Sequence, residues 1–274
     1  MTDRLADMRR RLEQAAHKHW TYEVEQHDEG GCPFYRIRVP TRGRRLYTIM
    51  IASGIHGDEP AGVEAVLRML EDQAVPANVA LEVFPCMNPE GYQACSRENG
   101  AGRDLNREFC VPAPAWPVDR FMAIAGSRRW DLYLDLHEDV DTEGFYMYEL
   151  EEDEPCLARA IVEAVERAGF PLEPAGHLDE VLTKDGLKFS DRPAEPGLSI
   201  QRRRDLPKEA TAQAIYMATR ADRVLTFETP GRAPFERRVA MHQVALRALF
   251  RELQRGRSAL LPNEFRAAEG RRRS

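Results

Sequence analysis

Apolar residues along the chain occur as short continuous runs that alternate with stripes of helical spacing. The runs predict core strands at 46–52, 81–86, 132–136 and 223–227, after two earlier strands at 22–26 and 34–39. Helical spacing predicts an amphipathic helix in 1–20, a helix that starts near Pro60, and helices over 119–126, 157–168, 209–219 and the last part of the chain. The alternation favours an α/β fold with a mixed, largely parallel central sheet flanked by helices.

Local signals add detail between these elements. Asp58 is predicted to be the N-cap of the helix at Pro60, which places Glu59 at the mouth of that helix. Asn88-Pro89-Glu90-Gly91 predicts a turn after the 81–86 strand. The segment 176–207 is rich in glycine, proline and charge, and we expect it to hold loops.

Two features near the carboxyl end are interpreted as structural. His242 lies on the apolar stripe of the last helix, so we expect a packed histidine and not a ligand. The arginine-rich tail 269–274 is expected to be frayed.

Composition narrows the class of protein. A chain of 274 residues with 43% hydrophobic residues and no linker-like shift in composition predicts a single domain over 1–274. A net charge of −6 points to no nucleic-acid partner, and no apolar run is long enough to predict a membrane partner. The charged start lacks secretory features, and five cysteines without a CxxC pair argue against disulfides or a thiolate zinc site. We expect a cytoplasmic protein.

Potential metal ligands stand at the downstream ends of core strands. His56 and Glu59 lie in GIHGDEPAG, His137 in LDLHED and Glu228 in LTFETP. A catalytic zinc takes three nitrogen or oxygen ligands and keeps one position open, and α/β sheets gather such residues at the carboxyl ends of their strands. Taken singly, His137 could be an ordinary hydrogen-bonding histidine and Glu59 a first-turn acid stabilised by the helix dipole. Together they predict one zinc site with Glu228 as its catalytic carboxylate.

The segment RENGAGRDLNREF, residues 97–109, adds the remaining motif after the NPEG sequence at 88–91. With it, the chain resembles the zinc carboxypeptidase family, whose pattern runs HxxE, NP(D/E)G, an arginine upstream of an (D)xNR segment, a histidine after a strand, and a glutamate. The superfamily includes murein peptide amidases and the aspartoacylase/succinylglutamate desuccinylase branch. The order from His56 to Glu228 covers most of the chain, and the combination is specific although each part is weak.

The resemblance implies a zinc-carboxypeptidase-like catalytic domain with one Zn²⁺ ion and a role for each matched residue. His56, Glu59 and His137 match the metal ligands, and Glu228 matches the general base and acid. Further matches are Arg97 as the arginine that steadies the oxyanion, Asn106 and Arg107 as the pair that grips a terminal carboxylate, and Asp104 as the carboxylate that orients the first zinc histidine.

General chemistry supports these roles. Zinc lowers the pKa of its water to about 7, and a nearby carboxylate can take the proton. An arginine fork binds a carboxylate through two parallel hydrogen bonds. A zinc-binding histidine usually gives its other N–H to an acceptor such as Asp104.

Several residues near the motifs keep two interpretations. Relatives usually place a tyrosine over the substrate. The spacing of the motifs does not choose among three candidate tyrosines. For each of them, packing in the core is the favoured role. Acidic residues after His137 could repel acidic substrates or hold a second cation, although a solvated loop is favoured. Arginines 202–204 could line a pocket for acidic side chains, although solvation is again favoured. The role of Arg103 is open. The tyrosines are Tyr146, Tyr148 and Tyr216, and the acidic residues are Glu138, Asp139, Asp141 and Glu143.

Three functions are compatible with these residues. The first is a carboxypeptidase or a related amidase that cuts cell-wall peptides, and the second is an N-acyl amino acid amidohydrolase. The third, a catalytically silent binding protein, is disfavoured because no ligand is lost. Aspartoacylase-like proteins carry a β-rich domain after the catalytic glutamate, whereas the residues after Glu228 have helical periodicity. The sequence therefore favours a peptidase acting on a peptide, with a small acyl-amino-acid as the alternative substrate, and it leaves the preferred side chain open.

Overall fold

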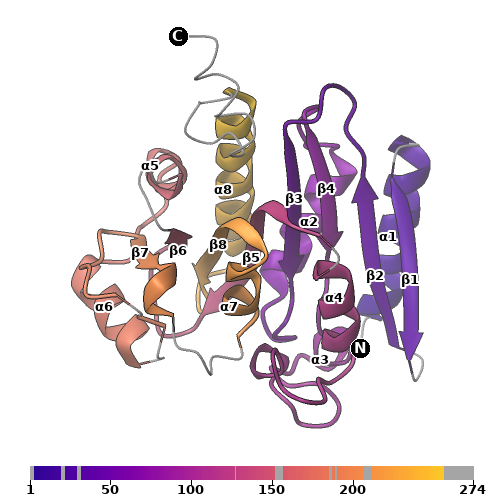
Figure 1. Ribbon diagram of the computed structural model, residues 1–274, viewed down its shortest axis with the longest axis horizontal. Helices are drawn as coiled ribbons and strands as arrows, with labels where there is room; N and C mark the ends of the chain where they lie inside the picture. The colour runs from indigo at the N-terminus through magenta and orange to yellow at the C-terminus, as the bar shows by residue number, and fades with distance from the viewer. Residues whose placement is uncertain are drawn as a thin grey trace.

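The strongest apolar runs of the sequence form the middle of a mixed β-sheet (Figure 1). The computed structural model describes residues 3–19, 22–29, 32–126, 128–151, 157–184, 187–188, 190–206 and 212–255. Within these residues the sheet has eight strands in the order β1-β2-β4-β3-β5-β8-β6-β7. The strands are β1 (Glu23–Glu29), β2 (Cys32–Val39), β3 (Tyr47–Ser53), β4 (Val79–Phe84), β5 (Trp130–Asp139), β6 (Tyr146–Glu151), β7 (Leu198–Arg202) and β8 (Ala221–Pro230).

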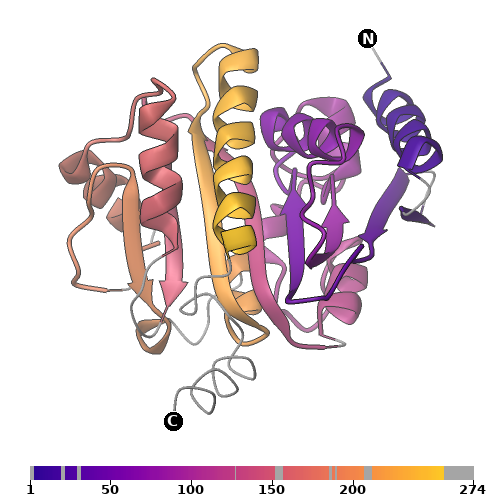
Figure 2. The ribbon, with the colours of Figure 1, turned by 90° about the horizontal axis from the view of Figure 1, so that it is seen from above.

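Helices connect the strands and cover both faces of the sheet. They are α1 (Arg4–His19), α2 (Pro60–Glu71), α3 (Pro89–Ala94), α4 (Val118–Ala125), α5 (Ala158–Arg167), α6 (Ala175–Lys184), α7 (Gln213–Ala218) and α8 (Phe235–Arg255), with short 3₁₀ turns η1 (Leu105–Arg107) and η2 (Arg203–Asp205). Figure 2 shows α8, in yellow, lying along one face between α5 and α2. None of the helices in the described ranges is both long and apolar enough to span a bilayer.

Four neighbouring strands in the centre are parallel, in the order β4-β3-β5-β8. The outer pairs β1/β2, β2/β4 and β6/β8 are antiparallel, and β6/β7 is parallel. The prediction of a single α/β domain with a mixed, largely parallel sheet is therefore confirmed. Because parallel strands end at the same edge, the residues that follow β3, β4, β5 and β8 meet there.

Side-chain alternation along β5 divides the interior into two cores. Leu132, Leu134 and Leu136 pack with residues of α1, α2, α5 and α8 on one face. Tyr133 packs with residues of α4, α6 and α7 on the other face. Consecutive residues at the end of β5 must therefore point to opposite faces of the sheet.

Most predicted elements are present with ends shifted by a few residues, but three local predictions are wrong and one strand was not predicted. Glu59, not Asp58, is the N-cap of α2. Asn88-Pro89-Glu90-Gly91 begins helix α3, because the Asn88 side chain accepts a hydrogen bond of 2.9 Å from the Gly91 amide, and so it is not a free turn. The segment 176–207 contains most of α6, together with β7 and η2, in its described part, and β6 was not predicted.

Packing explains why β6 and α6 were missed. The two predictions near the carboxyl end concern His242 and the tail 269–274. Strand β6 pairs with both β8 and β7, and α6 buries Leu178 and Leu182, so tertiary contacts override local composition. His242 is fully buried, as expected of a packed histidine. The tail 269–274 lies outside the described residues.

Gly57, between His56 and Asp58, allows two loops to touch. A Cβ atom at this position would lie 1.9 Å from the Gly91 carbonyl carbon and 2.2 Å from the Tyr92 amide nitrogen. Both are backbone atoms of α3, so a side chain could be accepted only if one loop moved. The contact fixes the residues that follow β3 against those that follow β4.

We expect Gly57→Ala to destabilise the fold by about 1–3 kcal/mol, the usual cost of overpacking a tight contact. Urea denaturation followed by circular dichroism measures the change. Gly176→Ala is the matched control, because a Cβ there meets nothing within 4 Å. Equal stability of the two variants would contradict the proposed constraint.

Candidate active site and metal centre

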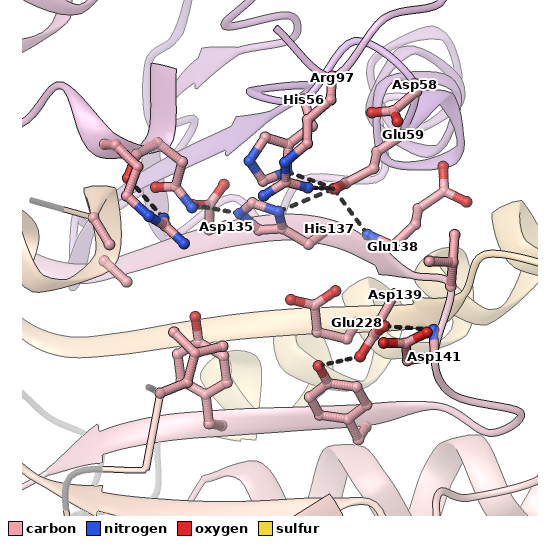
Figure 3. Close-up of a pocket in the computed structure, with 18 residues that line it drawn as sticks. His56, Asp58, Glu59, Arg97, Asp135, His137, Glu138, Asp139, Asp141 and Glu228 are labelled. Atoms are coloured by element: carbon pink, nitrogen blue, oxygen red, sulfur yellow. Dashed lines mark hydrogen bonds and ion pairs between the residues drawn. The ribbon is translucent and has the colours of Figure 1, made fainter. Parts of the chain in front are cut away.

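Three potential metal ligands converge at the carboxyl edge of the central strands. His56 lies in the loop after β3, Glu59 is the N-cap of α2, and His137 is in β5. The Nδ1 atom of His56 is 2.5 Å from Glu59 Oε1, and the Nδ1 atom of His137 is 3.0 Å from Glu59 Oε2. One potential ligand atom from each residue lies within 4.8 Å of the others, and all three residues are buried (Figure 3).

Each histidine presents its other ring nitrogen to a second carboxylate. His56 Nε2 is 3.3 Å from Asp104 Oδ1, as expected for the residue that orients the first histidine. His137 Nε2 is 3.2 Å from Asp135 Oδ2. Asp135 was not predicted, although its position two residues before His137 on the same strand places both side chains on one face. Such contacts fix the ring and leave Nδ1 as the nitrogen that faces Glu59.

The charges of Glu59, His56 and His137 shift the pKa values of one another. Burial tends to raise the pKa of Glu59, but His56 and His137 outweigh it and hold that pKa below its ordinary value. Burial tends to lower the pKa of both histidines, yet the carboxylates outweigh it. Glu59 and Asp104 raise the pKa of His56, and Asp135 and Glu59 raise that of His137 well above 6.5.

This donor set fits a zinc ion. It offers two imidazole nitrogens and one carboxylate oxygen in a buried site, the ligand types of catalytic zinc centres. Both histidines also have the carboxylate partners that usually support zinc ligands. His137 therefore lies close enough to His56 and Glu59 for one ion to contact all three residues.

Glu228 lies beside this group on the neighbouring strand. In the parallel register of β5 and β8, His137 is directly paired with Glu228 (Figure 3). Burial raises the pKa of the Glu228 carboxyl well above its ordinary value against the effect of His137, and the charges of Glu59 and Asp139 contribute to the rise. A carboxyl with a raised pKa is suited to exchange protons near neutral pH.

Arg97, Asn106 and Arg107 line one cavity of about 490 Å³ together with the three potential ligands and Glu228, whereas Asp104 does not line it. Arg97 Nη1 is 3.5 Å from Glu59 Oε1, and its Nη2 is 3.2 Å from Asp104 Oδ2. Asn106 Oδ1 accepts a hydrogen bond of 2.9 Å from the Gln213 amide at the start of α7. Arg107 is exposed to the cavity.

The three candidate tyrosines differ in whether they line the cavity. Tyr146 and Tyr148 line the cavity, whereas the hydroxyl of Tyr216 donates to the Met122 carbonyl oxygen at 3.1 Å outside it. Tyr146 pairs with Glu228 across β6 and β8, and its hydroxyl donates to Asp139 at 3.0 Å. Tyr146 and Tyr148 therefore pack as strand residues and also border the site.

The acidic segment after His137 is only partly a solvated loop. Asp141 is half-exposed and pairs with Lys184 at 2.6 Å, and Glu143 is exposed. Glu138 differs, because its side chain is buried between α2 and α8, where it contacts Arg238. The interpretation of Glu138 as a solvated residue is therefore wrong.

Two of the arginines whose roles the sequence left undecided, Arg103 and Arg203, have structural contacts. Arg103 forms an ion pair with Glu108 inside the 97–109 segment. Arg203 donates to backbone carbonyl oxygens, including that of Asp222 at 2.6 Å, and Arg202 is exposed. Neither Arg202 nor Arg203 lines the cavity, so the pocket interpretation is wrong for them. The side chain of Arg204 lies outside the described part of the chain.

The family profile described as "Succinylglutamate desuccinylase/Aspartoacylase catalytic domain" matches residues 45–181, half of the chain. The chain belongs to this family. The match includes His56, Glu59 and His137 and ends before Glu228. The resemblance to the metallocarboxypeptidase superfamily is thus confirmed, with the profile match falling in the desuccinylase and aspartoacylase branch.

Curated relatives match a shorter region. The chain is 36% identical over 93 residues to Carboxypeptidase SOL1 of Arabidopsis thaliana, which is 29% of this chain and 19% of that protein. It is also 36% identical over 89 residues to Murein peptide amidase A of Escherichia coli, which is 31% of this chain and 34% of the relative. The matched regions are well under two thirds of both relatives.

Solved structures share the fold of the whole domain. A candidate metallopeptidase from Shewanella amazonensis has a TM-score of 0.71 at 20% identity, over 92% of this chain and 94% of that one. A metallo-carboxypeptidase from Burkholderia cenocepacia gives 0.65 at 16% identity, over 89% and 68%. The succinylglutamate desuccinylase/aspartoacylase from Rhodobacter sphaeroides gives 0.53 at 16% identity, over 85% and 64%. These neighbours establish a metallocarboxypeptidase-like fold.

We expect zinc affinity to fall as the pH is lowered, with the loss beginning above pH 6.5, the ordinary pKa of histidine. The raised pKa values of His56 and His137 mean that both imidazoles are protonated at a higher pH than usual, and a protonated imidazole cannot bind a metal. Competition with a chromophoric chelator across a pH series measures the effect. Affinity that is constant from below to above pH 6.5 would contradict it.

Proposed function

We propose that the protein is a zinc-dependent metallocarboxypeptidase that hydrolyses the amide bond next to a free terminal carboxylate. The observation that carries the proposal is the single cavity that contains His56, Glu59, His137, Glu228 and Arg107. Metal-ligand, proton-transfer and carboxylate-binding chemistry therefore face one space. The match to a family of amide hydrolases and the fold of the structural neighbours support the proposal.

His56, Glu59 and His137 would hold one zinc ion. Zinc supplies Lewis-acid polarisation of a carbonyl and lowers the pKa of a water molecule when it is bound in such a site. Asp104 and Asp135 keep the two imidazoles oriented through their Nε2 atoms. Glu138 donates its backbone N–H to Glu59 Oε2 at 3.0 Å and so restrains the carboxylate ligand, Glu59.

Glu228 is assigned to proton transfer. It takes the proton of the attacking water as general base and returns a proton to the leaving amine as general acid. Its position beside His137 and its burial suit this role, since a shielded carboxyl with a raised pKa holds a proton more readily than an exposed one.

Substrate binding is assigned to the 97–109 segment. Arg107 provides a guanidinium for the terminal carboxylate, and Asn106 adds its amide NH₂ group because the amide oxygen already accepts from Gln213. Arg97 lies at the entrance between Glu59 and Asp104, where its charge can stabilise the negative charge that develops on the carbonyl oxygen.

Two substrate classes share this chemistry. In both a peptide and an N-acyl amino acid, the leaving amine carries a free carboxylate next to the cleaved bond. A peptide is favoured because solved metallopeptidase and metallo-carboxypeptidase structures share the fold over most of this chain, in which helix α8 packs on α2 and α5. The family profile favours N-acyl amino acid hydrolysis as the second candidate, and cell-wall peptides are a third.

The cytoplasm is our proposed compartment. Cys32, Cys86, Cys95 and Cys110 are free thiols among the described residues. Free cysteines are typical of proteins in reducing compartments.

We expect Glu228→Gln to keep zinc affinity within a few fold of wild type and to lower turnover about 10²- to 10⁴-fold, the usual contribution of a general base. Zinc-loaded protein is incubated with free-terminus peptides, cell-wall peptides and N-acyl amino acids, and the products are identified by mass spectrometry with the variant as the blank. Loss of single residues from peptide carboxyl ends supports the carboxypeptidase, and deacylation alone supports the second candidate. Wild-type turnover in the variant would contradict the assigned base.

We expect Arg107→Ala to raise KM about 10- to 100-fold for substrates with a free carboxylate, because a hydrogen bond to a charged group contributes about 1.5–3 kcal/mol. The same substrates blocked as terminal amides should lose much less. Arg103→Ala is the matched control, since that arginine pairs with Glu108 in the same segment. Equal losses on free and blocked substrates would assign Arg107 to structure.

A further inference from the structure

Helix α2 begins at a residue whose side chain does not cap it. Glu59 occupies the N-cap position but makes no side-chain cap hydrogen bond, because its carboxylate oxygens face His56 and His137. Pro60 follows at the first helical position and has no N–H group. The first N–H at this helix end is therefore that of Ala61, and its partner must come from elsewhere.

Glu138 supplies that partner from strand β5. Its Oε1 atom accepts the Ala61 N–H at 2.6 Å. Its own backbone N–H donates to Glu59 Oε2 at 3.0 Å. His137 and Glu138 both border the cavity, but the carboxylate of Glu138, the next residue along the strand, contacts α2 and α8. One residue thus contacts both the Glu59 carboxylate and the helix start that carries it.

Arg238 of α8 compensates the charge of Glu138. The guanidinium contacts Glu138 Oε2, and the two side chains are only 14% and 2% exposed respectively. A carboxylate buried to this degree is strongly destabilising unless it is paired. The pair therefore ties α8 to the start of α2, and Figure 3 shows Glu138 beside the Glu59 and His137 side chains.

We propose that Glu138, supported by Arg238, is a positioning residue that holds Glu59 for metal binding. The inference rests on the zinc site of the proposed function. Zinc bonds to carboxylate oxygens have lengths near 2 Å, so a helix start that moves by a fraction of an ångström changes ligand geometry. Loss of the Glu138 carboxylate frees the Ala61 N–H and lets the Glu59 backbone shift. Loss of Arg238 leaves a buried carboxylate unpaired at the same place.

A similar buried ion pair that caps a helix lies away from the cavity and serves as a matched control for Glu138 and Arg238. Glu149 in β6 is fully buried, accepts the Ala158 N–H at the start of α5 at 3.0 Å, and pairs with Arg223 at 2.7 Å. This arrangement repeats that of Glu138, Ala61 and Arg238, but neither Glu149 nor Arg223 lines the cavity. Substitutions of Glu149 should therefore report the purely structural cost of removing a buried cap and ion pair.

The test compares Glu138→Ala, Glu138→Gln and Arg238→Met with Glu149→Ala, Glu149→Gln and Arg223→Met. Three quantities are measured: urea stability of the metal-free proteins, Zn²⁺ affinity by chelator competition, and the visible absorption spectrum of the Co²⁺-loaded proteins. We expect Glu138→Ala and Arg238→Met to lose about 10- to 100-fold in Zn²⁺ affinity, as for other residues that support metal ligands, and to change the Co²⁺ spectrum. Glu138→Gln, which keeps an acceptor for the Ala61 N–H, should lose less. Arg238→Lys, which keeps the charge, should restore part of the affinity.

The Glu149 and Arg223 variants should lose stability but keep wild-type Zn²⁺ affinity and the wild-type Co²⁺ spectrum. If Glu138→Ala does not fold, Arg238→Met decides, because it removes the partner of the Glu138 carboxylate while Met retains much of the volume of the arginine stem. Equal Zn²⁺ affinities in the two sets would overturn the positioning role while leaving the proposed function intact. A wild-type protein that does not bind Zn²⁺ would instead overturn the metal site itself.

Discussion

The carboxylate of Glu59 between two buried imidazoles is the interaction on which the rest of the site depends. It brings negative charge to a place where burial alone would favour a neutral carboxyl, and His56 and His137 reverse that preference. The two histidines in turn require partners, which Asp104 and Asp135 provide. The result is a chain of alternating acids and imidazoles whose outer members fix the inner ones. Such a chain is preorganised for a cation, since its donor atoms already converge.

Strand β5 separates the chemistry of the site from its mechanical support. Asp135, His137 and Glu138 all line the cavity, but the Glu138 carboxylate is held by the Ala61 N–H of α2 and by Arg238 of α8. The strand can do both because consecutive side chains point to opposite faces of the sheet. The neighbouring strand β8 adds Glu228 in register with His137. A shift of one residue in the β5 and β8 pairing would move Glu228 to the helix-covered face and separate it from the ligands.

Family membership and geometry constrain the function to different degrees. The profile match places the chain among the succinylglutamate desuccinylases and aspartoacylases, while solved metallopeptidases and metallo-carboxypeptidases share the fold over most of the chain. Both groups are amide hydrolases, and one cavity unites the groups such a reaction needs. The choice between a peptide and an N-acyl amino acid depends on the part of the substrate that lies beyond the reacting bond.

The sequence by itself determined the order of the central elements and the residues at their ends. Strongly apolar runs predicted β3, β4, β5 and β8, and the motifs after them named His56, Glu59, His137 and Glu228, because local hydrophobicity and residue chemistry are written in the chain. Tertiary structure alone decided which partners support them. The contacts of Glu138 with Ala61 and Arg238, and of Asn106 with Gln213, join segments through space. Strand β6 likewise forms because β8 and β7 offer it hydrogen bonds, and a single sequence carries no local signal for such distant pairings.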